Sequence, residues 1–424
     1  MKLHTSLCGA LVMAAMLSGH AQEKNNPGTT TPPPVTANAD TTPENKPSEE
    51  KKWYDRILLR GYMQFRQNNL VNTNENLTCA QCDASWGGNG GVSVRRARIV
   101  VQGQMTTNVF IKLEADFATA LTATAAGANQ NFTQVRDAYA DIGFDPNNEL
   151  KVRLGQSKVP YGFENLQSSG TRLSLDRSDA INSALNGERD MGAFLYYTPM
   201  RIKKLYADLV NLNYKGSGDF GILAFGIYNG QTTNRPEMNR SQHVVARATY
   251  PFTIGKQIIE AGAQAYTGRY VMYDNQLSSA VTRTADKNYT DQRAAASFVL
   301  YPKPFGIQAE YNIGRGPQFD KPTQAVITKD LEGGYILANY RIPLKNMMLF
   351  PYSRYQYYKG GRKFELDARY YAVHQFDFGT EWIMNKYFKF TAEYCVSSRN
   401  YIDFVTQNNA QKGSSLRVQA QVNF

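Results

Sequence analysis

The chain has 424 residues, a formal net charge of +11, 33 glycines and 12% aromatic residues. Its N-terminal apolar run is too short for a membrane-spanning helix, and the rest of the chain is poor in long apolar runs, so a helical membrane protein is excluded. A soluble protein of this length would be expected to alternate helices and strands over several domains. No sustained helical period is predicted after Trp53.

The N-terminal segment has the features of an export signal. Lys2 precedes an apolar run from Leu3 to Leu17, and Gly19-His20-Ala21 places small residues at the usual cleavage spacing. Residues 1–21 are therefore predicted to be a signal peptide. Residues 22–52 are rich in Pro, Thr, Asn and Glu and are predicted to form a flexible linker. We interpret it as a spacer, with a peptidoglycan- or partner-binding arm as the alternative, and expect the folded domain at 53–424.

Polar and apolar residues then alternate in short segments that lie between turn residues. In the first segment, Arg60, Tyr62, Gln64 and Arg66 share one face, and Leu59, Gly61, Met63 and Phe65 share the other. Charged residues lie on one face of the next segments too, at 96–104, 109–117, 137–144 and 150–154. A soluble domain would not place so many charges on the inner faces of its strands, whereas the water-filled lumen of a membrane barrel would.

The connections alternate between short and long, which is typical of outer-membrane barrels. Tight turns are predicted at residues 106–108, 145–148, 253–256, 302–304 and 343–346. Long outer loops are predicted at residues 68–91, 118–133, 159–190, 231–242, 272–288, 316–330, 360–368 and 402–413. Eight loops predict an all-β, transmembrane antiparallel barrel of sixteen strands with both ends in the periplasm. Residues 199–214 also alternate like a strand, so eighteen strands are the alternative.

The last nine residues, 416–424, alternate up to a terminal aromatic. Leu416, Val418 and Phe424 lie on one face, and Arg417 and Gln419 on the other. A strand with lipid on one side and water on the other has this pattern. A half-buried strand of a soluble sandwich would alternate in the same way. In the barrel interpretation this strand closes the wall by pairing with the first strand near residues 60–66.

Several motifs resemble the phosphate-selective porin O/P family of outer-membrane porins. They are the runs 94–98, 110–117, 135–139 and 154–162, followed by Ser168-Ser169, Asp176-Arg177 and the run 187–192. The resemblance is ordered from Arg60 to about Tyr228, although Asp176 stands where the family would have Glu. It implies a sixteen-stranded, trimeric barrel in the outer membrane of a Gram-negative bacterium, acting as a passive channel that in some members selects anions or phosphate.

Basic residues are the candidates for contact with a solute. The long loop at 159–190 is expected to fold inward as the constriction, with Lys158 at its base and Arg172, Arg177 and Arg189 within it. Guanidinium groups are always charged and suit phosphate or carboxylate oxygens. Each cation has an alternative role in pairing with Asp or Glu to stiffen the wall. The lumen faces are predicted to add Arg60, Arg66, Arg96, Arg98, Lys112, Arg153 and Arg247.

The sequence favours a porin for small hydrophilic solutes that prefers anions. The alternative is a non-conducting barrel that serves adhesion, envelope assembly or partner interaction. Nucleic acid is not expected as a partner in an exported barrel, whereas outer-membrane lipid is. Cys79 and Cys82 are predicted to form a tight disulfide, and Cys395 to be a free thiol. Since His243 and His374 lack a nearby Ser on their strands, no enzyme, cofactor or metal site is expected.

Overall fold

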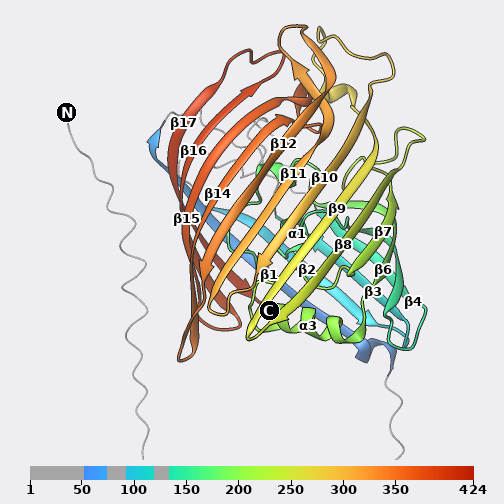
Figure 1. Cartoon of the computed structure of the whole chain (residues 1–424), viewed down its shortest axis with the longest axis vertical. Helices are drawn as coiled ribbons and strands as arrows, with labels where there is room; N and C mark the ends of the chain where they lie inside the picture. The colour runs from blue at the N-terminus through green and yellow to red at the C-terminus, as the bar shows by residue number, and fades with distance from the viewer. Residues whose placement is uncertain (1–51, 74–91, 119–132) are drawn as a thin grey trace, which may run out of the picture. The chain divides into compact units, whose positions relative to one another are not determined.

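The structure is a computed structural model that describes residues 52–73, 92–118 and 133–424. In these residues, one sheet of antiparallel strands closes on itself (Figure 1). Its strands are β1 (Ile57–Thr73), β2 (Val92–Gln104), β3 (Val109–Asp116), β4 (Gln134–Gly143), β5 (Leu150–Lys158), β6 (Arg189–Tyr197), β7 (Leu223–Tyr228), β8 (His243–Ile254), β9 (Gln257–Val271), β10 (Asn288–Leu300), β11 (Phe305–Asp320), β12 (Ala325–Tyr340), β13 (Ile342–Leu344), β14 (Met347–Gly361), β15 (Tyr370–Ile383), β16 (Phe388–Ile402) and β17 (Ala410–Asn423).

The prediction of a sixteen-stranded barrel is confirmed. The three-residue β13 continues β12, because both pair with β14, so the described wall has sixteen strands. The barrel closes between its first and last strands, where Tyr62 pairs with Asn423 and Arg66 with Gln419. The alternation of the C-terminal residues therefore belongs to the closing strand.

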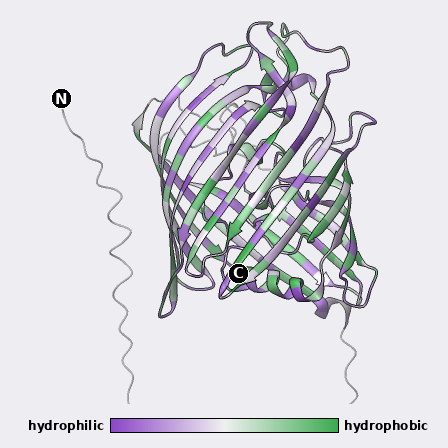
Figure 2. Ribbon diagram, in the orientation of Figure 1, coloured by the Kyte–Doolittle hydropathy of each residue, from purple (hydrophilic) through white to green (hydrophobic). Residues whose placement is uncertain are grey.

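Apolar side chains cover the outside of the wall, and polar ones point inward. On β15, Phe376 and Phe378 are exposed on the outer face, while Gln375 and Asp377, which alternate with them, are buried. Figure 2 shows the hydropathy changing from residue to residue along the strands. Inward residues such as Arg417 are fully buried, which means that other protein groups fill much of the lumen. This is the pattern of a wall between lipid and a polar interior.

The loops follow the predicted asymmetry with two exceptions. Short turns join the strands at the end where β1 begins and β17 ends, which is the periplasmic end in outer-membrane barrels, but a longer connection of residues 198–222 joins β6 to β7 there. The predicted loop at 316–330 is wrong, because β11 and β12 continue as a paired hairpin to Asp320 and Ala325. The glycine and proline at 316–317 indicated a turn, but both pair within this ladder. Cys79, Cys82 and residues 1–51 lie outside the described residues.

Residues 199–214 contain a helix rather than a strand. This corrects the alternative of eighteen strands and the expectation that no helical period follows Trp53. Helix α3 (Met200–Asn211) lies at the periplasmic end of the barrel, between β6 and β7 (Figure 1). Ile202, Tyr206 and Leu209 are buried on one face, at helical spacing. The helical period was missed because the run at residues 205–212 was interpreted as alternating, although Ile202 and Leu209, seven residues apart, would lie on opposite faces of a strand. The short helices of the described chain are α1 (Phe163–Leu166), α2 (Asp179–Asn182), η1 (Trp53–Arg56), η2 (Asp274–Gln276) and η3 (Leu366–Ala368). None of the described helices has both the length and the apolar character needed to cross a membrane.

Candidate solute pathway

The loop between β5 and β6, residues 159–188, folds into the lumen as predicted, and we call it the third loop. Its backbone N–H groups bond to distant strands of the wall. The N–H of Glu164 donates to Glu310 on β11 (2.8 Å), and that of Asp179 donates to Gln356 on β14 (2.8 Å). The N–H of Leu175 donates to Glu393 on β16 (3.2 Å). Because β5 and β6 lie far around the ring from these strands, the loop crosses the barrel interior.

Buried ion pairs anchor the third loop to the opposite wall. Asp176 accepts hydrogen bonds from Arg66 on β1 (2.9 Å) and Arg417 on β17 (2.6 Å). Burial alone would raise the pKa of the Asp176 carboxyl, but these two guanidinium groups outweigh it and hold the pKa well below its usual range. Glu164 pairs in the same way with Arg354 on β14 (3.0 Å). The loop is thus fixed by charge pairs that water does not reach.

Apolar contacts hold the two ends of the third loop. Near β5, the ring of Tyr161 packs edge-on against Tyr266 on β9, with 4.9 Å between the ring centroids. Further along, Leu173 and Ile181 pack in a cluster with Phe350 and other buried residues of β12 and β14. Burial of such side chains contributes roughly 1.5–3 kcal/mol each. The loop is therefore a packed part of the barrel core.

A polar cavity of about 570 Å³ lies between the tip of the third loop and the wall of β1–β5. The segment after α3 and the rim at the C-terminal Phe424 also line it. Two side-chain carboxylates line it, those of Glu114 and Asp137. Ten cationic side chains line it: Arg60, Arg98, Lys112, Arg153, Lys158, Arg177, Arg189, Lys215, Lys386 and Lys389.

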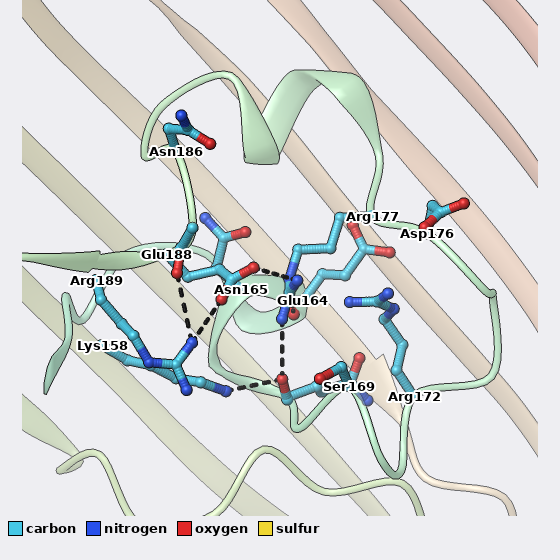
Figure 3. A network of polar contacts seen from close by, with 12 residues as sticks. Lys158, Glu164, Asn165, Ser169, Arg172, Asp176, Arg177, Asn186, Glu188 and Arg189 are labelled. Carbon is cyan, nitrogen blue, oxygen red and sulfur yellow. Dashed lines mark hydrogen bonds and ion pairs between the residues drawn. The ribbon is translucent and has the colours of Figure 1, made fainter. Parts of the chain in front are cut away.

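Most of the predicted basic residues pair with carboxylates, and five of them do so at this cavity. Arg189 bonds to Asp137 (2.5 Å) and to Glu188 (2.7 Å), and Glu188 also pairs with Arg177. Figure 3 shows Glu188 and Arg189 next to Lys158 at the base of the third loop. Carboxylate partners are also present for Arg66, Arg98, Lys112, Arg153 and Arg247. Seven of the eleven candidates therefore have a carboxylate partner, as in the alternative role that the sequence left open.

Four candidates have no carboxylate within 4.0 Å among the described residues: Arg60, Arg96, Lys158 and Arg172. Arg172 donates to carbonyls of its own loop at Ser174 (2.9 Å) and Leu175 (3.0 Å), and Arg96 donates to Gln64 (2.9 Å). Lys158 donates to the carbonyls of Leu166 and Gln167, both at 2.8 Å. Of these four, Arg60 and Lys158 line the cavity. Arg66, Arg96, Arg172 and Arg247 lie away from it.

Sequence reasoning missed three cations of the cavity: Lys215, Lys386 and Lys389. Lys389 alternates with Phe388 and Phe390, so its lumen-facing position was readable from the pattern. Lys215 follows α3 in a glycine-rich segment that has no period, and Lys386 lies in a turn. Nothing local in the sequence indicated where these two side chains point.

One group in the described chain brings together side chains that could ligate a metal. The ligand atoms of Asp377, Glu393 and Cys395 lie within 4.8 Å of one another on the lumen wall. Arg354 bonds to Asp377 (2.9 Å), and Arg417 bonds to Glu393. Since guanidinium groups already satisfy both carboxylates, we assign no metal to this group.

A closed sixteen-stranded barrel with an apolar exterior, a polar lumen and an inward loop is the architecture of an outer-membrane channel for small solutes. The sequence agrees, because residues 82–424 match the family model of phosphate-selective porin O and P. The chain belongs to this family, and so to the outer membrane of a Gram-negative bacterium. Both the family and the fold are those of a transporter rather than an enzyme.

Solved structures share the fold at low sequence identity. The outer membrane channel DcaP of Acinetobacter baumannii is 14% identical, with a TM-score of 0.52, covering 87% of this chain and 97% of its own. OmpF of Salmonella typhi, in complex with daunomycin, is 15% identical, with a TM-score of 0.50 and the same coverage. OmpT of Vibrio cholerae is 11% identical, with a TM-score of 0.50, and the match covers 87% of this chain and 97% of OmpT. Among curated proteins, no sequence matches significantly.

Proposed function

We propose that the channel lets small hydrophilic solutes diffuse passively and that it favours anions. The observation that carries this proposal is the lining of the cavity, where ten cationic side chains meet two carboxylates. A polar passage with low-dielectric walls concentrates counter-ions of the opposite sign. Phosphate preference and assembly as a homotrimer, which the family resemblance implies, belong to the same proposal.

The excess of positive charge persists after pairing is taken into account. Four further carboxylates do not line the cavity but pair with cations that do. They are those of Asp116, Asp141, Glu188 and Glu381. Even with these four, the carboxylates are fewer than the ten cations. Lys158, at the base of the third loop, donates to two backbone carbonyls and pairs with no carboxylate in the part of the chain that the structure describes.

Replacing Lys158 by Gln is expected to reduce the preference for anions about threefold. A charge about 6 Å from a passing ion contributes roughly 0.7 kcal/mol even at the dielectric constant of water. The amide of Gln keeps one donor for the loop carbonyls. Reversal potentials in a salt gradient across a planar bilayer measure the change. Lys256→Met, in the exposed β8–β9 turn, is the control and should leave the potential unchanged. An equal effect of both variants would contradict the role of Lys158.

The same bilayer measurement separates the porin from the alternative. Pure, folded protein should conduct, and the reversal potential should have the sign of anion preference. Block of the chloride current by phosphate would support the phosphate-selective form. Absence of conductance would favour a barrel that serves adhesion or envelope assembly, and cation preference would contradict the anion proposal.

A further inference from the structure

The connection between β6 and β7 is unusual for a periplasmic turn, because it contains α3 and runs on to residue 220. We call residues 200–220 the periplasmic bar. The apolar face of α3 packs into the barrel end, where Leu209 and Tyr206 contact a cluster that includes Phe163 of the third loop and Tyr301. The other face carries exposed residues such as Lys204. The helix is therefore docked on the barrel by its apolar face.

After α3, the bar reaches the opposite wall of the barrel. The ring of Tyr214 lies 4.8 Å from Lys303, in the β10–β11 turn, and 4.8 Å from Arg341, beside β13. The ammonium of Lys215 bonds to Glu381 on β15 and lies 4.3 Å from the ring of Phe350 on β14. In the ring of strands, β15 stands opposite β6, from which the bar starts.

The chain then returns to its starting side. Asp219 accepts a hydrogen bond from Thr198, at the end of β6 (2.6 Å), and lies 3.5 Å from Lys151 on β5. The segment from residue 198 to residue 219 thus crosses the periplasmic mouth and comes back. Along this path, Val210, Asn213, Lys215, Ser217 and Phe220 line the basic cavity.

The bar is also bonded to the tip of the third loop. The side chain of Gln167 donates to the carbonyl oxygen of Lys215 (2.7 Å). Lys389 on β16 donates both to Glu381 (2.7 Å) and to the carbonyl of Gly170 in the third loop (2.5 Å). Glu381 therefore lies between two lysines, one from the bar and one from the wall. The third loop and the periplasmic bar are therefore joined, and together they fill the lumen on the side of β9–β16.

We propose that the periplasmic bar is a second filter of the channel, which makes solutes pass between it and the wall of β1–β5. Lys215 and Lys389 are the cations that a solute meets there. This inference rests on the proposed function, because it assumes that the cavity is part of a conducting path. It assigns a specificity role to residues outside the third loop.

A cysteine at position 217 tests whether the bar lines the path. Ser217→Cys is modified from the periplasmic chamber of a bilayer with an anionic methanethiosulfonate reagent. Modification should lower the single-channel conductance and the anion preference about twofold, the effect of one charge about 10 Å from a passing ion in water. Lys204→Cys, on the exposed face of α3, is the matched control, and treated wild type accounts for the native cysteines. If Ser217→Cys does not fold, Asn213→Cys replaces it.

The outcomes separate the two proposals. If wild type conducts and modified Ser217→Cys changes as expected while Lys204→Cys does not, the bar lines the path. If wild type conducts but modified Ser217→Cys, confirmed by mass spectrometry, behaves as before, the second filter is overturned and the porin stands. If wild type does not conduct, both proposals fall.

The charge of Lys215 should also make selectivity depend on pH. Burial lowers its pKa, Glu381 opposes the shift and Lys389 adds to it, and together they bring the pKa to about 8. These are the charged groups that face it, from β16 and β15. Raising the pH from 7 to 9 should therefore remove this charge and reduce the anion preference about twofold. The Lys215→Met variant should not show this loss of anion preference between pH 7 and pH 9. An identical pH profile in Lys215→Met and wild type would contradict the role of Lys215.

Discussion

Replacing Asp176 by Ala is expected to detach the third loop from the wall and to destabilise the barrel by about 3–5 kcal/mol, the usual cost of removing one partner of a buried ion pair. Arg66 and Arg417, both fully buried, would lose the carboxylate between them. The midpoint temperature of the heat-induced mobility shift on gels should fall, and the open-channel current should become noisier as the loop moves.

An exposed ion pair provides the control for Asp176. Asp274 pairs with Lys287 at 2.5 Å, and its side chain is 82% exposed. Surface pairs contribute about 0–1 kcal/mol, so Asp274→Ala should leave the midpoint nearly unchanged. If Asp176→Ala behaves like this control, the buried pairs do not anchor the loop.

Replacing Arg177 and Arg189 together by Ala is expected to lower the ratio of anion to cation permeability about tenfold. Each lost charge contributes about threefold at roughly 6 Å. The carboxylates of Glu188, Asp137 and Glu114 would then face the cavity without these partners. The reversal potential in a salt gradient measures the effect.

Two further variants show whether net charge or local structure causes this change. Arg177→Met combined with Glu188→Gln removes an ion pair without changing net charge, so the permeability ratio should stay within about twofold. Arg201→Ala with Lys204→Ala removes two exposed cations from α3 and should have no effect. A large change in either control would mean that the ratio does not report the charge at Arg177 and Arg189.

The wall of the barrel was readable from the sequence because its cause is local. Each strand lies between lipid and a polar lumen, so its residues alternate with a period of two wherever the strand is regular. The pairing of the last strand with the first near residues 60–66 follows from that pattern and the strand count, and the structure places Gln419 opposite Arg66. The inward fold of the third loop was also expected, from its length and its arginines.

The alternating pattern did not reveal two β-bulges in the wall. The register between β1 and β2 shifts between Gln64 and Phe65, and that between β3 and β4 shifts between Glu114 and Ala115. At these bulges an extra residue breaks the alternation. Arg95 and Arg136 occupy the extra positions, and both contact the third loop. Alternation alone placed these arginines on the outer face.

The sequence by itself determined the strands, their two faces and the excess of cations, because hydrophobic alternation and charge are properties of neighbouring residues. It left open whether residues 199–214 extend the wall or cap it, because residues 205–212 were interpreted as alternating like a strand. Only the tertiary structure settled that, since the apolar face of α3 is buried at the barrel end. It also decided which cations meet at the cavity, because Lys215 and Lys158 come together through contacts between segments far apart in the chain.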